Sequence, residues 1–242
     1  MRYLFLFMFL VAIFVLGSRS CGNFHFGFGI RGEGPVKTEN RSASDFHAVA
    51  LEIPALVEVT VAERYTVEVQ AQENILPLLK TEVENGRLRI YFEENVSHSE
   101  GLKVRVSAPS FDELGIGGSG TIKALSTLSG DRLKLAIGGS GDIDVPQTNV
   151  GNMECSIAGS GNIRVGGKTN EVQFNIAGSG DIAAKELAAI TGTAEIAGSG
   201  SVNCNVSQTL KTSISGSGDV YYTGSPSVDT DISGSGKVKK VD

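Results

Sequence analysis

The chain has 242 residues, of which 40% are hydrophobic, and its formal net charge at pH 7 is −6. That length corresponds to one domain or two, and the apolar fraction is sufficient for a sizeable core. The negative charge, without a long run of lysine or arginine, argues against a nucleic-acid partner and against a polybasic membrane-binding patch. Glycine, at 31 positions, is enriched over a background of about 7%.

The first 20 residues form a separate unit. Arg2 supplies a positive charge, and residues 3–16 are an uninterrupted apolar stretch. This stretch is too short for a typical membrane-spanning helix and is typical of the hydrophobic region of a signal peptide. Small residues at Ser18 and Ser20 then precede a possible cleavage site. We therefore predict that residues 1–20 are a signal peptide and that the mature chain is exported from the cytoplasm.

Cys21 follows this segment directly and has two interpretations. In the first it is the lipidated first residue of a bacterial lipoprotein, although Ser18 stands where such a signal usually has leucine. In the second, cleavage after Ser20 is ordinary and Cys21 carries no lipid. We favour lipidation, which predicts an outer-membrane lipoprotein of the cell envelope, held to the membrane by its lipid anchor only. The periplasmic and surface sides both stay open. Residues 21–35 form either a tether or a first strand.

Residues 36–113 contain several segments in which apolar and polar residues alternate, such as residues 57–61 and 87–92. This period of two is typical of strands with one buried face. Asn85-Gly86 indicates a tight turn between two such strands. We interpret residues 36–113 as irregular β coils that extend or cap the repeat described next. A separate small β domain is the alternative.

Residues 114–242 are a tandem repeat built on Gly-Ser-Gly, which occurs seven times at spacings of 18 to 21 residues. The serines of the triplets are Ser119, Ser140, Ser160, Ser179, Ser199, Ser217 and Ser235. An isoleucine stands three residues before each serine, and an isoleucine or valine stands three residues after it. Self-similarity at a fixed period of this length indicates a solenoid.

The repeat predicts strands in preference to helices, because apolar residues alternate ahead of each triplet and the glycines would break a helix. One coil would hold about three short strands and three corners, which gives an all-β, right-handed parallel β-helix. With the isoleucines inward, strict alternation places both glycines of the triplet inward and the serine outward. The seven serines then form an exposed ladder, about 4.8 Å apart from coil to coil, and are the candidate recognition site.

Cys155 and Cys204 alternate with apolar neighbours more than two repeats apart. Stacked coils would separate them by roughly 10 Å or more, beyond the ~7 Å limit for a disulfide. We predict two buried free thiols.

Residues with catalytic or metal-binding chemistry are sparse. His25, His47 and His98 all precede the repeat and show no metal-ligand spacing, so we assign no catalytic residue, no metal site and no cofactor. A calcium ladder is not favoured, because Asp142 is one position early for the known β-roll motif. Asp142, Asp144 and Arg164 are the best candidate group for glycan cleavage, but alternating charges on a solvated sheet explain them equally well.

The Asp45-Phe46-His47-Ala48-Val49 segment, the strand start at Gly86-Arg87-Leu88-Arg89-Ile90 and the Ile-x-Gly-Ser-Gly-Asp-Ile coils resemble the putative auto-transporter adhesin, head GIN domain family of exported bacterial proteins. The resemblance covers residues from about 34 to the C-terminus. It implies a pectin-lyase-like β-helix without a catalytic set and a role in cell adhesion.

The function expected from the sequence is therefore a non-enzymatic, exported, adhesin-like binding protein with an unidentified glycan or protein partner. The alternatives are a glycan-active enzyme on the same fold and a structural envelope protein that self-associates, which would be a homo-oligomer. No nucleic-acid partner is expected.

Overall fold

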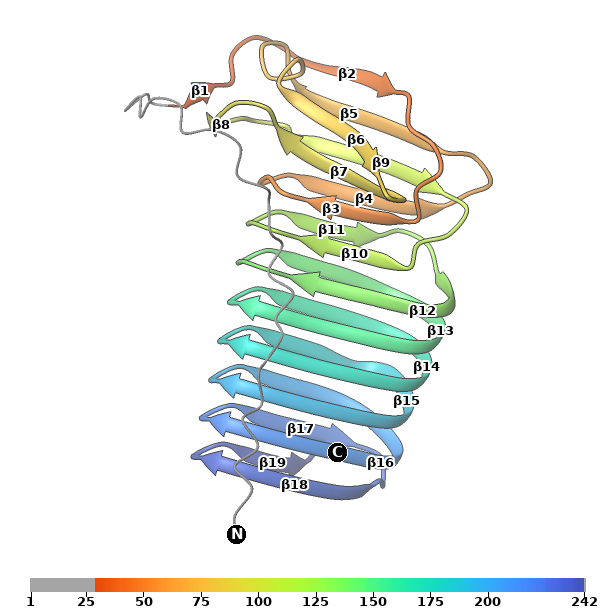
Figure 1. The fold of residues 1–242 in the computed structure, drawn as a ribbon, viewed down its shortest axis with the longest axis vertical. Helices are drawn as coiled ribbons and strands as arrows, with labels where there is room; N and C mark the ends of the chain where they lie inside the picture. The colour runs from red at the N-terminus through yellow and green to blue at the C-terminus, as the bar shows by residue number, and fades with distance from the viewer. Residues whose placement is uncertain (1–28, 242) are drawn as a thin grey trace.

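The computed structural model describes residues 29–241. The predicted signal peptide, Cys21 and His25 lie outside this part of the chain. Within it there are strands and turns but no helix, and parallel coils stack into an elongated solenoid (Figure 1). In Figure 1 the front strands run to the left and the back strands to the right while the chain descends, which is a right-handed winding. The predicted all-β, parallel β-helix is confirmed.

The Gly-Ser-Gly coils are built from strands that pair in parallel with the strand one coil away. These strands are β10 (Glu113–Ile116), β11 (Thr121–Ala124), β12 (Leu128–Ile137), β13 (Asp142–Gly159), β14 (Asn162–Gly178), β15 (Asp181–Gly198), β16 (Ser201–Gly216), β17 (Asp219–Thr223), β18 (Ser227–Gly234) and β19 (Lys237–Lys240).

The core consists of side-chain columns that run through the coils. The isoleucines before the triplets pair in register and form one such column: Ile116, Ile137, Ile157, Ile176, Ile196, Ile214 and Ile232. The aliphatic residues after the triplets form a second column on the opposite sheet, from Ile122 to Val238. From Ile116 to Ile214 the isoleucines are at most 3% exposed, whereas Ile232 in the last coil is 38% exposed. Repetition of one residue type is thus itself a packing solution.

Each regular coil has three strand segments. The pairing between β13 and β14 covers residues 142–145, 148–150 and 152–159 of β13. It breaks twice: the register shifts between Val145 and Thr148, and residue 151 is skipped without a shift. The breaks and the Gly-Ser-Gly turn are the three corners of the coil. Inward residues alternate along all three segments, for example Ile143, Thr148 and Cys155.

The N-terminal strands are β1 (Ile30–Arg31), β2 (Val36–Arg41), β3 (Ala48–Leu51), β4 (Leu56–Val61), β5 (Thr66–Gln72), β6 (Leu79–Glu84), β7 (Arg87–Phe92), β8 (Val96–His98) and β9 (Lys103–Ala108). β3 and β4 pair in parallel with β10 and β11 and so continue both sheets of the coils. β2, β5 and β6 join by antiparallel pairing and lie at the upper end in Figure 1. We call these three strands and their connecting turns the cap. The domain boundaries stay predictions.

The two glycines of a triplet do not behave alike. In the first six triplets the second glycine is buried, as predicted, whereas the first is half-buried. In the five coils from β13 onward the first glycine has a positive φ, such as +136° at Gly178. That backbone conformation breaks the alternation and directs the missing side chain toward the preceding coil, where a Cβ on Gly178 would lie 2.3 Å from the carbonyl oxygen of Gly159. The prediction that both glycines face the core is therefore wrong for the first one.

Cys155 and Cys204 are both buried and free, as predicted. Cys155 pairs in register with Phe174, whereas Cys204 pairs with Ala184 on another segment of the coil.

Candidate functional site

The seven triplet serines form one continuous edge of the solenoid, which we call the serine edge. All seven side chains are exposed. From the second triplet onward, each serine N–H donates a hydrogen bond to the carbonyl oxygen of the first glycine in the preceding triplet, for example 3.0 Å from Ser160 to Gly139. None of the seven hydroxyl groups has a hydrogen-bond partner within residues 29–241. The coil stacking thus aligns the hydroxyls and leaves them free for an external partner.

A polar column, made of the residue that directly follows each triplet, runs beside the serine edge. Its side chains bond to one another between coils: Asn162 Nδ2 donates to Asp142 Oδ1 at 2.8 Å, and Ser201 Oγ donates to Asp181 Oδ1 at 2.6 Å. These carboxylates therefore stabilise the stack. In the described part of the chain no three His, Cys, Asp or Glu side chains are grouped as they would be around a metal ion.

The group considered for glycan cleavage is only partly assembled. Asp144 and Arg164 are register partners on neighbouring coils, while Asp142 is bonded to Asn162. Asp144 Oδ1 is buried and has no hydrogen-bond partner among residues 29–241. The structure thus places the two carboxylates and the guanidinium on one sheet face.

An interaction that the sequence did not indicate joins His47 and Asp112. The distance between His47 Nδ1 and Asp112 Oδ1 is 2.8 Å, although the residues are 65 positions apart. The other ring nitrogen faces the turn at Gly86, where an added Cβ would lie 2.5 Å from Nε2. The pair thus connects the start of β3 to the start of β10.

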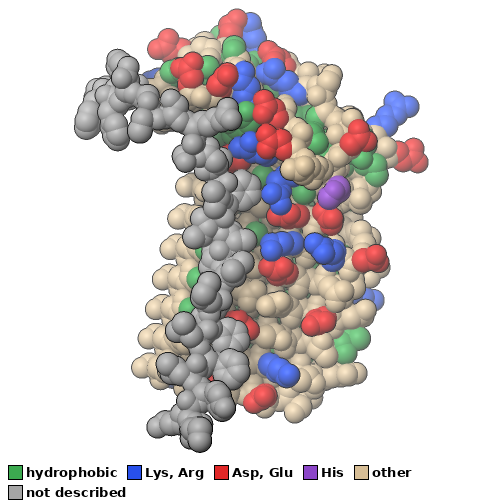
Figure 2. Space-filling model, in the orientation of Figure 1, with side chains coloured by type: hydrophobic (Ala, Val, Ile, Leu, Met, Phe, Trp, Pro, Cys, Tyr) green, Lys and Arg blue, Asp and Glu red, His purple; other side chains and the backbone are tan. Residues whose placement is uncertain are grey.

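Charged side chains are densest over the cap and the coils next to it and become sparser over the lower coils (Figure 2). The charges are paired across strands, as in Arg89–Glu52 and Lys134–Glu154, both at 2.9 Å. The hydrogen bond to Glu52 is the first cause that raises the pKa of Arg89. Such pairs act as cross-strand contacts that stabilise the stack.

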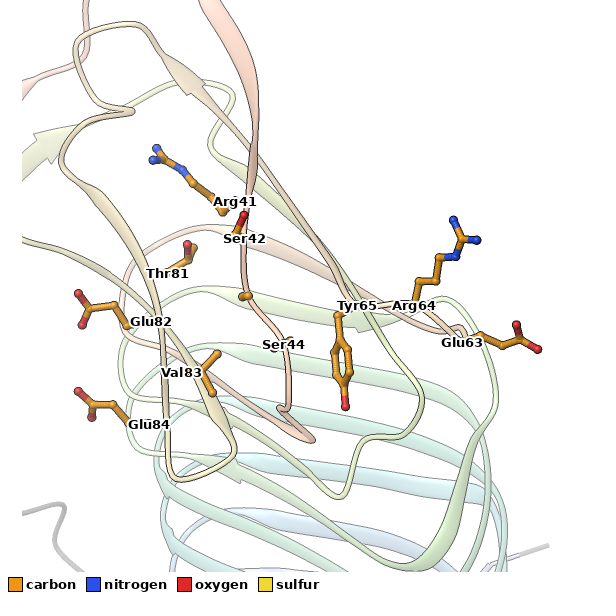
Figure 3. A pocket seen from close by; sticks show the side chains of 11 residues that line it. Arg41, Ser42, Ser44, Glu63, Arg64, Tyr65, Thr81, Glu82, Val83 and Glu84 are labelled. Carbon is orange, nitrogen blue, oxygen red and sulfur yellow. The ribbon is translucent and has the colours of Figure 1, made fainter.

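The cap carries a broad, open depression of about 1230 Å³. Three chain segments line it: residues 41–44, residues 63–65 and residues 81–84 of β6 (Figure 3). Figure 3 shows that Val83 lies on the opposite side of β6 from Glu82 and Glu84, and that Glu63 and Arg64 point away from the depression. The sequence analysis did not find this site, because three segments with no shared motif form it.

No helix in residues 29–241 is long and apolar enough to cross a membrane.

Comparisons with known proteins find a family and solved structures that are consistent with the observed solenoid. A family model described as "Putative auto-transporter adhesin, head GIN domain" matches residues 45–226. Among solved structures, a "putative lipid binding protein" from Parabacteroides distasonis is 27% identical, covers 88% of this chain and 99% of its own, and has a TM-score of 0.75. A "putative adhesin" from Parabacteroides merdae is 25% identical with the same coverage and a TM-score of 0.70.

A "putative adhesin" from Bacteroides fragilis superimposes with a TM-score of 0.82, covering 88% of this chain and 100% of its own. At 19% identity that likeness shows the fold alone. A comparison with curated proteins finds no match.

Proposed function

This chain belongs to the family described as "Putative auto-transporter adhesin, head GIN domain", and on that premise we propose that it is a non-enzymatic, exported, adhesin-like binding protein of the cell envelope. The observation that carries the proposal is the serine edge, with its seven exposed and unbonded hydroxyl groups in register. A row of equal hydroxyls about 4.8 Å apart suits an extended partner that offers hydrogen-bonding groups repeatedly, such as a glycan or a polypeptide.

The supporting physical argument is rigidity. Each triplet is bonded to its neighbours through the backbone, and its glycines pack against the preceding coil. The hydroxyls are therefore held in place before a partner arrives, which reduces the entropy that binding would cost. Weak single contacts can then add up along several coils.

The test compares a serine-edge variant with a matched control. The variant replaces Ser140, Ser160, Ser179 and Ser199 with alanine. The control replaces four exposed serines that lie off this edge, namely Ser110, Ser129, Ser213 and Ser227. A glycan array and retention on purified bacterial envelopes measure binding, and product analysis of the bound glycans measures cleavage.

We expect the serine-edge variant alone to lose binding, and no bound glycan to be cleaved. Equal binding by both variants would mean that the triplet only turns the chain. Cleavage products would favour the glycan-active alternative. An apparent molar mass by light scattering that rises with protein concentration would favour the self-associating one.

Lipid anchoring is a separate part of the proposal. Its support is the position of Cys21 directly after the apolar stretch. We expect Cys21→Ser to release the protein from the membrane fraction, and the wild type to incorporate radiolabelled palmitate. Absence of label would leave ordinary cleavage after Ser20 and no lipid.

A further inference from the structure

We propose that the cap holds a second binding site, apart from the serine edge, in which the free edge of β6 accepts an extended peptide strand. The pattern of this strand would be basic, small aliphatic, basic. The site is the depression of Figure 3, and β6 forms one of its walls.

The first step of the argument is the unpaired edge of β6. Among the described strands, β6 pairs only with β7. Glu84 and Arg87 close a two-residue turn, in which Asn85 and Gly86 both have a positive φ. The pair that closes such a turn is hydrogen-bonded, and hydrogen-bonded pairs alternate along an antiparallel ladder.

This alternation decides which backbone groups of β6 are free. Glu82 and Glu84 bond to β7, so the N–H and C=O groups of Thr81 and Val83 point away from it, into the depression. Within residues 29–241 no backbone hydrogen bond to Thr81 or Val83 from the open side occurs. Free donors and acceptors at strand spacing match another strand, which is the geometry of β-strand addition.

The second step concerns side chains. Val83 faces the inner side of its sheet, where its register partner Leu88 is fully buried. Val83 itself is 36% exposed, because no strand lies beyond β6. A strand added there would cover Val83 with its own inward residue, and a small aliphatic side chain fits beside valine.

The third step is charge. Glu82 and Glu84 lie on the outer side of β6, and the Glu84 side chain is 54% exposed. Their partners both come from β7: Tyr91 donates a hydrogen bond to Glu82 at 2.8 Å, and Arg89 lies 3.2 Å from Glu84.

Two positive charges lie nearby, and both are already engaged. Lys80 of β6 pairs with Glu93 at 2.8 Å, and Arg41, which lines the depression, bonds to Glu39 and to the carbonyl oxygen of Leu76. Lysine or arginine at the outward positions of an added strand would complete cross-strand ion pairs.

Two other occupants fit less well. A second copy that paired through its own β6 would bring the two Glu-Val-Glu edges together, and like charges on edge strands oppose such pairing. A glycan would find little aromatic surface on which to stack a sugar ring in this depression. The aromatic residue lining the depression is Tyr65, whose ring packs against Phe46 at 5.1 Å between centroids.

The experiment measures binding of a fluorescent peptide, Gly-Thr-Lys-Val-Lys-Val-Thr-Gly, to the full chain by anisotropy. Its control peptide has glutamate in place of both lysines. Val83→Pro removes the outward N–H of Val83 but leaves the bonds of β6 to β7 in place, because proline is tolerated where an edge N–H faces away from the sheet. Circular dichroism and thermal melting check that the variants fold.

We expect the lysine peptide to bind the wild type, the glutamate peptide not to bind, and Val83→Pro to weaken binding by about tenfold or more. The double variant Glu82→Lys, Glu84→Lys should exchange the preference of the two peptides. The serine-edge variant should bind the lysine peptide as the wild type does, which separates this site from the proposed function. Three outcomes would each overturn the proposal: the lysine peptide does not bind, Val83→Pro leaves its binding unchanged, or Val83→Pro abolishes the binding of a glycan.

Discussion

Gly180 lies against Ile157 of the preceding coil: a Cβ built on Gly180 would be 2.7 Å from Ile157 Cγ2 and 2.5 Å from the carbonyl oxygen of Gly161. Real side chains do not tolerate such distances, so the isoleucine column and the glycine of the next turn share one space. We expect Gly180→Ala to lower the free energy of unfolding by about 1–3 kcal/mol, as for overpacked cores. Urea unfolding measures this value.

The matched control for that variant is Gly130→Ala, since a Cβ on Gly130 has no atom within 4 Å. Its free energy of unfolding should change by no more than about 0.5 kcal/mol. Equal effects of the two substitutions would contradict the close packing of turn on turn.

Adjacent residues of one triplet should differ sharply in their contribution to stability. Ser179 is exposed and its hydroxyl is unbonded, so Ser179→Ala should change stability by no more than about 0.5 kcal/mol. Gly178→Val should cost far more, because it combines a positive φ with a clash against the backbone of Gly159. Thermal melting of the two variants measures this difference in stability. A serine variant that melts as low as the glycine variant would contradict the outward placement of the serines.

Glu58 should make stability depend on pH. Lys103 Nζ lies 2.7 Å from this carboxylate and Arg105 Nε lies 3.3 Å from it. The hydrogen bond from Lys103 is the first cause that lowers the pKa of Glu58 below its ordinary 4.5, with Arg105 adding to it and burial opposing it. A lowered folded-state pKa stabilises the fold above the unfolded value, and this stability is lost as the pH falls through the folded value.

Accordingly, we expect Glu58→Gln to be less stable than the wild type at pH 7, by no more than about 1 kcal/mol for a pair near the surface. The difference should shrink as the pH falls below about 4.5, the ordinary pKa of the group. Urea unfolding of both proteins at pH 7, 5 and 3.5 gives the comparison. A difference that persists undiminished at pH 3.5 would show that lost packing, not charge, is its cause.

The two buried thiols should react only when the coils open. Burial raises the pKa of Cys155 and raises that of Cys204 to about 12, so almost no reactive thiolate exists at pH 8. In a Cys21→Ser background, a thiol-specific disulfide reagent should modify neither cysteine of the folded protein within minutes and both in guanidinium chloride. Rapid modification of the folded protein would indicate that the coils open on that timescale.

The register of the solenoid could be read from the chain in advance. Ile137, Ile157 and Ile176 recur at a fixed distance from Ser140, Ser160 and Ser179, and they do pair with one another. Prediction succeeds here because each coil stacks on a near copy of itself, so the partner of every residue is its own equivalent one period away.

The cap and its depression could not be predicted in the same way. Alternation along residues 81–84 indicates which side of the strand is buried, but it does not say which strand lies beside it or that one edge stays unpaired. Likewise, nothing near His47 in the sequence points to Asp112. These contacts join segments that share no repeat, and their partners are chosen by packing across the whole molecule.

The sequence alone therefore determined the stacked coils, their inward isoleucines and the outward serines, since local alternation and a fixed period specify them. Only the tertiary structure decided the direction of the first glycine in each triplet and the open edge of β6. The first depends on a positive φ that period-two alternation does not include. The second depends on the strand pairing of the cap, which is non-local and has no copy elsewhere in the chain.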